Sequence, residues 1–392
     1  MEGTERTVVA AWLQACSQLL VAAADEETRT RPYVRPEHEP FLETRFRTFE
    51  EYLAAASPRS FLGYTRLYPA EFQELYECLA PVISHPRNHR APICPKRRLC
   101  MYLRFIGHGS SYQSLSAEFT CGERTVSAVV DEVTEAVIKV LFGRAFPRLV
   151  RRDFEDIAHR TQARYDYPRA IGFMDGKHVA IKKPAHSGSG YFNYMKFHSI
   201  ILLACCDCDY NIIAFDVGAP GRAGDAGVFR TSDVKRWMEE NESSFPETRE
   251  LGEVGPVQFH FLVDSGFGQD FRLVRPYPNQ GDGDMSRMRF NRKHSGARRL
   301  IESTFGILCR RFAVLQKPVE LNPVKTSRLV ISLMVLHNLV ARRKDALRDV
   351  ERYPPYEGAL ASLQNEEGSD GAGSAVTARD KIKQHYDQLY GI

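Results

Sequence analysis

The 392-residue sequence lacks the features that mark several common classes of protein. Its longest purely apolar run, Ile200 to Cys206, has seven residues, whereas a membrane-spanning helix needs about 20. The first residues, Met1 to Arg6, do not show the basic and then apolar order of a secretory signal. No glycine-rich nucleotide-binding loop, H-E-x-x-H motif or G-x-S-x-G motif occurs. The sequence therefore predicts no membrane contact and offers no short catalytic motif of a common kind.

Cysteine is sparse and odd in number, with nine thiols in a chain long enough to build a hydrophobic core. We therefore predict reduced thiols and an intracellular protein. The stretch Cys205-Cys206-Asp207-Cys208 contains one C-x-x-C pair, but it lies in an apolar segment without a second pair. Buried thiols are favoured there over a zinc site. His337 lies in an apolar helical segment, and we interpret it as a core residue rather than a ligand.

The net charge is also small: the chain has 53 Lys and Arg and 49 Asp and Glu, which gives +4. Its distribution is more informative. The segment Met285 to Lys317 carries nine basic residues and a single acid, Glu302. Such a segment suits a phosphate backbone, and the alternative is an ordinary solvated helix face.

Changes of pattern along the chain predict four segments. Residues 1–65 form an extension without a clear pattern, residues 66–146 an all-helical unit, residues 165–345 an α/β unit, and residues 346–392 a flexible tail with a short terminal helix, Thr377–Tyr390. The tail contains a stretch rich in Gly, Ser and acids that is typical of linkers.

The all-helical unit shows the order of helices in a helix-turn-helix. Its predicted helices are Ala70–Val82, Lys96–Ile106, Tyr112–Phe119 and Glu123–Phe142. The last is the candidate recognition helix, with Arg124 near its N-terminus and Arg97, Arg98 and Arg104 as backbone contacts. Acids in the middle of this helix leave open the alternative that the unit only packs or dimerises.

The α/β unit begins with apolar, β-rich stretches and ends with helical ones. Its predicted strands are Ala170–Ile181, Ser199–Cys208, Ile212–Val217 and Val257–Val263, and its predicted helices are Ala226–Asn241, a helix after Asn291, and Ser327–Arg343. Strands first, with helices between and after them, predict a layered α/β or α+β fold.

Three carboxylates stand out in this unit. Asp175 interrupts the first strand, Asp264 ends the fourth, and Glu302 lies on the basic helix. Such acids can meet at one edge of a sheet and hold Mg²⁺, and two ions can clamp the attacking and leaving oxygens of a phosphodiester. Taken singly, a turn, a cap and a surface ion pair explain them as well.

Six motifs between Gly172 and Leu339 closely resemble DDE-type transposases of the PIF/Harbinger superfamily and their domesticated nuclease relatives. The motifs are Met174-Asp-Gly-Lys-His-Val179, Pro220-Gly-Arg-Ala-Gly-Asp-Ala-Gly-Val-Phe229, Val263-Asp-Ser-Gly-Phe267, Phe290-Asn-Arg-Lys-His-Ser-Gly-Ala-Arg298, Ile301-Glu-Ser-Thr-Phe-Gly306 and Leu336-His-Asn-Leu339. They cover about 170 residues in the order of the family. The upstream helices resemble the helix-turn-helix of the same family.

The resemblance implies an RNase H-like mixed sheet flanked by helices, preceded by a helix-turn-helix domain. It implies catalytic, metal-binding roles for Asp175, Asp264 and Glu302, with two Mg²⁺ or Mn²⁺ ions. Asp225 is an auxiliary candidate, although an N-cap or loop role for it is favoured. Where the family often has His-Asp-Ser and a Lys, this chain has Gly224-Asp225-Ala226 and Cys309. Neither difference removes one of the three acids.

The sequence thus predicts a metal-dependent DNA endonuclease or transposase that cleaves, and can transfer, DNA phosphodiesters. The predicted DNA contacts are Arg97, Arg98, Arg124, Arg292, Lys293, Arg298, Arg299, Arg310 and Arg311. The resemblance further implies that the protein is located in the nucleus, with the cytoplasm as a second location, and that it has a Myb-like partner protein. A domesticated, catalytically silent DNA-binding or chromatin-associated protein is the alternative, and a protein–protein adaptor is a third, weaker one.

Overall fold

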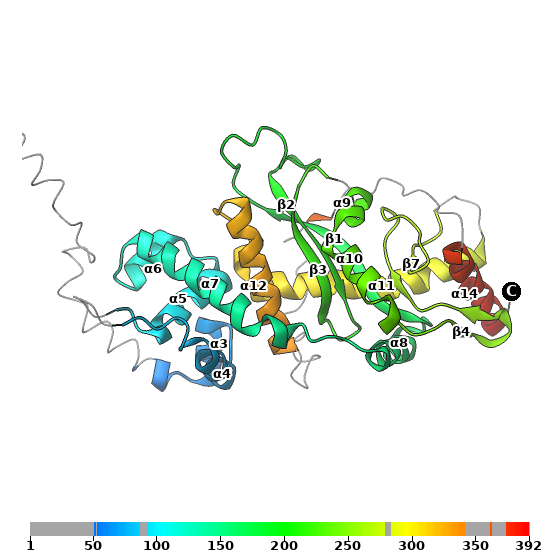
Figure 1. Cartoon of the computed structure of the whole chain (residues 1–392), viewed down its shortest axis with the longest axis horizontal. Helices are drawn as coiled ribbons and strands as arrows, with labels where there is room; N and C mark the ends of the chain where they lie inside the picture. The colour runs from blue at the N-terminus through cyan, green and yellow to red at the C-terminus, as the bar shows by residue number, and fades with distance from the viewer. Residues whose placement is uncertain are drawn as a thin grey trace, which may run out of the picture.

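The computed structural model describes residues 51, 53–86, 92–223, 225–278, 284–341, 361–362 and 374–391. The predicted extension 1–65 therefore lies mostly outside the described residues, as does the Gly- and Ser-rich stretch of the tail. The described part combines a helical region with a mixed sheet that has helices on both sides (Figure 1). None of its helices is long and apolar enough to cross a bilayer.

The helical region precedes the sheet in the sequence, and its helices occur in the predicted order. Its helices are α3 (Pro58–Thr65), α4 (Pro69–Leu79), α5 (Pro95–His108), α6 (Tyr112–Glu118) and α7 (Glu123–Ala145). Proline occupies the first position of α3, α4 and α5, where the missing N–H costs nothing. Gly109 ends α5 with a left-handed φ of 60°, and the Ser111 hydroxyl caps α6 by accepting from Ser114 N.

The main sheet has the strand order β3-β2-β1-β6-β7, and β8 pairs with the far half of β1. Its strands are β1 (Ala170–Ala180), β2 (Ser199–Cys206), β3 (Ile212–Pro220), β6 (His260–Leu262), β7 (Leu273–Val274) and β8 (Ala361–Ser362). β1 runs antiparallel to β2 but parallel to β6. Nearly every residue of β1 and all of β2 are buried, so the long apolar runs mark strands covered on both faces. A separate two-stranded ribbon pairs β4 (Arg249–Glu250) with β5 (Pro256–Val257).

Helices cover the sheet on both sides. These helices are α8 (Arg151–Tyr165), α9 (Asp225–Thr231), α10 (Asp233–Glu240), α11 (Met285–Arg311), α12 (Pro323–Ala341) and α14 (Ser374–Tyr390). In the view of Figure 1, α10 lies in front of the sheet and α11 passes behind it. Short 3₁₀ turns complete the layers: η2 (Glu242–Ser244), η3 (Gly252–Val254) and η4 (Ala313–Gln316). The predicted mixed sheet with flanking helices is confirmed.

Some boundaries differ from the prediction, each for a local reason. The stretch expected as one helix, 226–241, forms two, because the Ser232 hydroxyl caps a new helix by accepting from Lys235 N. Helix α11 starts before Asn291, since the Asp284 carboxylate accepts from Ser286 N and Arg287 N. Helix α8 was not predicted. The terminal helix was, and it is slightly longer than expected.

Helix α12 joins the helical region to the sheet. Two acids in the middle of α7, Asp131 and Glu135, form ion pairs with Lys325 and Arg328 of α12 at 2.5 and 2.8 Å. In the sequence, these acids argued against deep insertion of α7 into a DNA groove. In the structure they are used to pair α7 with α12. The helical region and the sheet share one continuous hydrophobic core.

The motif Leu336-His-Asn-Leu339 explains how α12 is fixed. Asn338 is fully buried; its amide accepts from Ile212 N at 2.9 Å and donates to Ile212 O and Ala145 O at 2.7 and 3.1 Å. His337 is a buried core residue, as predicted, with Nε2 2.8 Å from Tyr210 O and Nδ1 3.1 Å from Arg311 Nη1. Its pKa is lowered to about 3 by burial and by Arg311.

We predict that Asn338→Ala lowers the free energy of unfolding by about 2–4 kcal/mol, because it leaves three buried backbone groups without partners. Urea denaturation followed by circular dichroism measures this difference. Gln162→Ala, on an exposed part of α8, is the matched control and should change stability by less than about 0.5 kcal/mol. Equal stability of both variants would contradict this role of Asn338.

Candidate active site

The parallel pairing of β1 with β6 brings two of the predicted acids together. Phe173 of β1 lies opposite Leu262 of β6. Asp175 and Asp264 are each two residues beyond this pair, so they lie side by side, Asp175 within β1 and Asp264 just after the end of β6. The third acid, Glu302, is supplied by α11, which packs against β1 and β2.

Asp175 is held within the sheet and is only 3% exposed. Its Oδ1 accepts from Gly176 N at 2.9 Å. Its Oδ2 lies 3.3 Å from Lys177 Nζ and 3.7 Å from Arg298 Nη1. Lys177, itself 7% exposed, sits two residues after Asp175, on the same face of the strand. Sequence reasoning assigned no role to Lys177, although its spacing from Asp175 was a signal for it.

Glu302 is oriented by the buried face of α11. Ala297, Ile301 and Phe305 point into the core and fix the rotation of the helix. Arg298, one turn before Glu302, donates from Nη2 to Glu302 Oε1 at 2.6 Å. The guanidinium group of Arg298 therefore bridges Asp175 and Glu302, and the structure brings these side chains to one place.

The site concentrates negative charge beside two cations. Burial and the neighbouring Asp175 carboxylate raise the pKa of Asp264 to about 6, and Arg298 and Lys177 only partly offset this. Burial disfavours a charged Arg298, but the attraction of Asp175, Glu302 and Asp264 outweighs it and raises the pKa of Arg298. The three acids thus form one electrostatic unit with Arg298 at its centre.

The donor chemistry of this unit fits a hard divalent cation, since all three candidate ligands are carboxylates. In the part of the chain that the structure describes, however, no three His, Cys, Asp or Glu side chains are grouped closely enough to hold an ion. Arg298 stands between the acids and supplies the positive charge. Simultaneous binding of one ion by all three requires the ion pairs of Arg298 to loosen.

Asp225 can be placed only by its backbone, which opens α9. Its side chain lies outside the described residues, so the auxiliary role stays a prediction.

The predicted DNA-contacting residues fall into three groups. Arg124, Arg292, Arg299 and Arg310 are exposed and Arg97 is half-buried, so their contacts with DNA stay predictions. Lys293 and Arg298 are already paired with acids. Lys293 forms an ion pair with Asp166 at 2.6 Å, and Arg298 forms one with Glu302 at 2.6 Å.

Two of the predicted contacts need correction. Arg98 is 7% exposed, donates to Ile93 O and forms an ion pair with Glu132. Arg311 is 1% exposed and hydrogen-bonds to His337. Both guanidinium groups lie inside the protein and hold helices together, so they do not reach a phosphate in this conformation.

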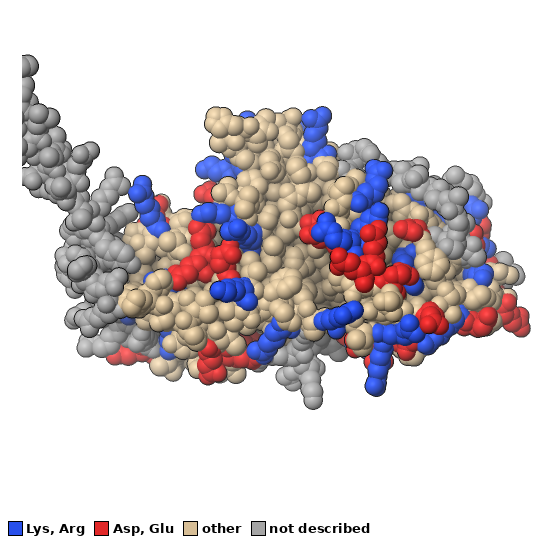
Figure 2. All heavy atoms as spheres, in the orientation of Figure 1, with Lys and Arg blue, Asp and Glu red and all other residues tan. Residues whose placement is uncertain are grey.

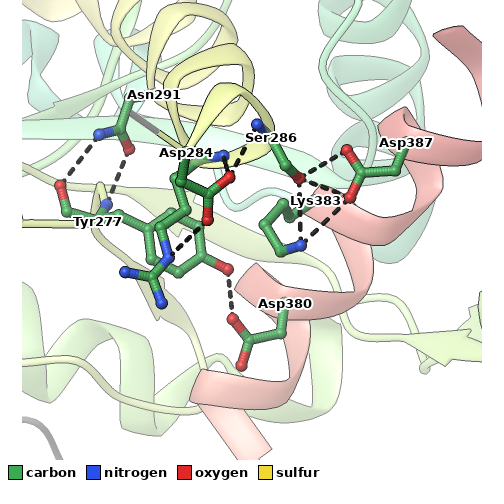
Figure 3. Close-up of polar contacts among 8 residues, drawn as sticks. Tyr277, Asp284, Ser286, Asn291, Asp380, Lys383 and Asp387 are labelled. Carbon is green, nitrogen blue, oxygen red and sulfur yellow. Dashed lines mark hydrogen bonds and ion pairs between the residues drawn. The ribbon is translucent and has the colours of Figure 1, made fainter. Parts of the chain in front are cut away.

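The start of the basic helix is covered by the C-terminal helix α14 (Figure 3). Ser286 of α11 donates to Asp387 Oδ2 at 2.5 Å, and Tyr277 donates to Asp380. Arg289 donates to the Tyr386 carbonyl at 3.2 Å. The sequence analysis did not predict this packing of α14 on α11. The only sequence signal for it is the helical spacing of acids and tyrosines near the C-terminus.

We predict that Asp264→Asn stabilises the metal-free protein at neutral pH. An acid with a pKa raised from 3.8 to about 6 weakens the fold as pH rises through that range, because its ionised form is disfavoured. Removing this charge should raise the free energy of unfolding at pH 7.5 by about 1–2 kcal/mol, allowing for partial solvent screening. The difference should disappear towards pH 4.

Urea unfolding in EDTA across this pH range measures the effect. Asp233→Asn, at an exposed site on α10, is the control. A destabilised Asp264→Asn variant at pH 7.5 would contradict this electrostatic account.

Comparison with known proteins points to the same part of the chain. Residues 174–338 match the family model "DDE superfamily endonuclease", and this range contains all three acids. No solved structure matches the chain.

Curated relatives cover more of the chain than this domain. "Putative nuclease HARBI1" of Homo sapiens is 26% identical over 303 residues, which is 74% of this chain and 77% of that protein. The Mus musculus protein of the same name is 25% identical over 295 residues, with the same coverage. "Protein ALP1-like" of Arabidopsis thaliana is 23% identical over 265 residues, 66% of this chain and 63% of that protein. These similarities support a Harbinger-type protein derived from a DDE transposase.

Proposed function

We propose that this protein is a DNA endonuclease that depends on a divalent metal ion and cleaves phosphodiesters at Asp175, Asp264 and Glu302. The observation that carries the proposal is the convergence of these acids from β1, the end of β6 and α11 on one guanidinium group. The endonuclease family match and the relatives named as nucleases support it.

The strand order also supports an RNase H-like core. An antiparallel β3-β2-β1 unit is continued by β6 and β7, which run parallel to β1. In this arrangement the first and fourth strands of the main sheet are neighbours, so Asp175 within β1 and Asp264 just beyond the end of β6 can act together.

The residues divide the work as follows. Asp175, Asp264 and Glu302 would hold Mg²⁺ or Mn²⁺, two ions in the arrangement that the family resemblance implies. Bound ions supply a nucleophile at neutral pH and stabilise the departing oxygen. Without an ion, Arg298 and Lys177 hold the acids in place. When its pairs loosen, Arg298 is placed to bind a phosphate oxygen.

DNA would reach the site along exposed cations, for which Arg292, Arg299 and Arg310 of α11 are the candidates. Arg124 at the start of α7 is exposed where a recognition helix would read bases, and a helix-turn-helix role for α6 and α7 belongs to the same proposal. Strand transfer uses the same acids with a DNA 3′-hydroxyl in place of water. A nuclear location and a Myb-like partner stay predictions from the resemblance.

Cleavage of supercoiled plasmid with Mg²⁺ or Mn²⁺ tests the proposal. We expect wild type to nick the plasmid and Asp264→Asn and Glu302→Gln to lose at least about 100-fold in rate, because each removes a ligand charge worth several kcal/mol at the transition state. Glu239→Gln, at an exposed position of α10, is the matched control and should cut like wild type.

Equal cutting by all variants would show that these acids are not the active site. No cutting by the wild type would overturn the enzymatic proposal in favour of a catalytically silent DNA-binding protein.

A further inference from the structure

The loop that joins β1 to β2, residues 181–198, is a basic projection at the edge of the sheet. No Asp or Glu occurs between Asp175 and Asp207. Lys182, Lys183 and Lys196 are all exposed on the loop. The projection rises above β2 in Figure 1, and on its visible face Figure 2 shows basic but no acidic side chains.

One tight turn of this loop, residues 194–196, which we call the tip, exposes large apolar side chains. Tyr194 and Met195 are each 48% exposed, and Lys196 follows them. The three residues form a tight turn between Asn193 and Phe197, whose backbones pair through Asn193 N to Phe197 O at 2.9 Å. Aromatic and apolar groups held out into solvent beside lysines indicate a binding surface.

Buried polar groups make the tip rigid. Asn193, only 3% exposed, accepts from Phe197 N at 3.2 Å and donates to Ser199 Oγ at 3.0 Å. The Ser199 hydroxyl lies 2.9 Å from Nδ1 of His178, which is on β1. The His178 ring also contacts the Tyr194 ring, with centroids 6.0 Å apart. The tip is thus anchored to the strand that carries Asp175.

A glycine allows close packing against Ser199, one of the residues that anchor the tip. Gly221 N donates to Ser199 O at 2.9 Å, and a Cβ at this position would come within 2.1 Å of Ser199 Oγ. The next residue, Arg222, donates to Ser189 Oγ of the loop at 3.4 Å and adds a further exposed cation. The motif that begins Pro220-Gly-Arg therefore supports the loop.

The position of the loop relates it to the acids. From Asp175, β1 continues for five residues to Ala180, about 17 Å at the usual rise of a strand, and the loop starts there. This distance is the length of a few nucleotides. A partner bound to the loop can therefore extend to Asp175 without a change of fold.

We propose that residues 194–196 bind DNA a few nucleotides from the scissile phosphate, where Tyr194 and Met195 stack on an unpaired base and Lys182, Lys183 and Lys196 contact phosphates. The identity of the partner rests on the proposed function. DNA is a polyanion with flat apolar rings, so it matches both features of the loop. Its phosphates suit the lysines, which have no acids beside them, and its bases suit the small, rigid apolar tip. Stacking there would also open the duplex a few nucleotides from the bond that is cut.

Fluorescence anisotropy of the full chain in EDTA tests this binding without cleavage. The probes are a short labelled duplex of mixed sequence and the same duplex with a central mismatched bubble that carries 2-aminopurine. We expect the double variant Tyr194→Ala/Met195→Ala to bind the bubble about tenfold more weakly, with a smaller loss on the intact duplex, and to change the 2-aminopurine signal less than wild type.

The lysines make a different prediction. Lys182→Ala/Lys183→Ala should weaken binding to both probes and reduce the slope of log K against log salt by about 2. Tyr194→Phe keeps the ring and should bind like wild type. Leu389→Ala removes an equally exposed side chain from α14, far from the loop, and should have no effect.

Unchanged affinity of both double variants for both probes would overturn the inference, even if the plasmid is cut. A selective loss on the bubble supports it, even if the plasmid is not cut, because this readout needs no catalysis. Failure of wild type to bind any DNA would overturn both this inference and the proposed function.

Discussion

The parallel pairing of β1 with β6 is the constraint on which the site depends. It places Asp175 and Asp264 at equivalent positions on neighbouring strands, so that two carboxylates share one partly buried region. Two such charges repel each other, and the repulsion must be compensated by a cation. Arg298 supplies that cation from α11, and in doing so it ties the helix that carries Glu302 to the sheet.

This compensation links stability to chemistry. The raised pKa of Asp264 shows that the acids are gathered at a cost to the fold, which is expected where a site is organised to bind cations rather than to pack well. Lys177 and Arg298 lower this cost. Their position also means that the acids are kept together before any substrate arrives, and that two cations stand ready beside them.

The surroundings of the site hold α11 at both ends. At its start, α14 binds Ser286 and Arg289, and towards its end Arg311 is locked into α12 through His337. β1 is held equally firmly by β2, β6 and β8. The exposed loop after β1 inherits this rigidity through His178, Ser199 and Asn193. The candidate catalytic groups and the proposed binding groups thus project from elements whose own positions are fixed by the core.

The sequence by itself determined the order of the elements and the three acids. Long apolar runs identified β1 and β2, proline and glycine marked the ends of α4 and α5, and the motifs around Asp175, Asp264 and Glu302 named the family. These signals are local, so periodicity and motif spacing are enough to detect them. Only the tertiary structure decided which basic residues are available. Arg98 and Arg311 look like Arg299 in the sequence, yet Arg98 is buried against α7 and Arg311 against α12, and α14 covers the start of α11. Burial and charge pairing depend on which distant segments meet, and that is settled by packing of the whole core rather than by any local pattern.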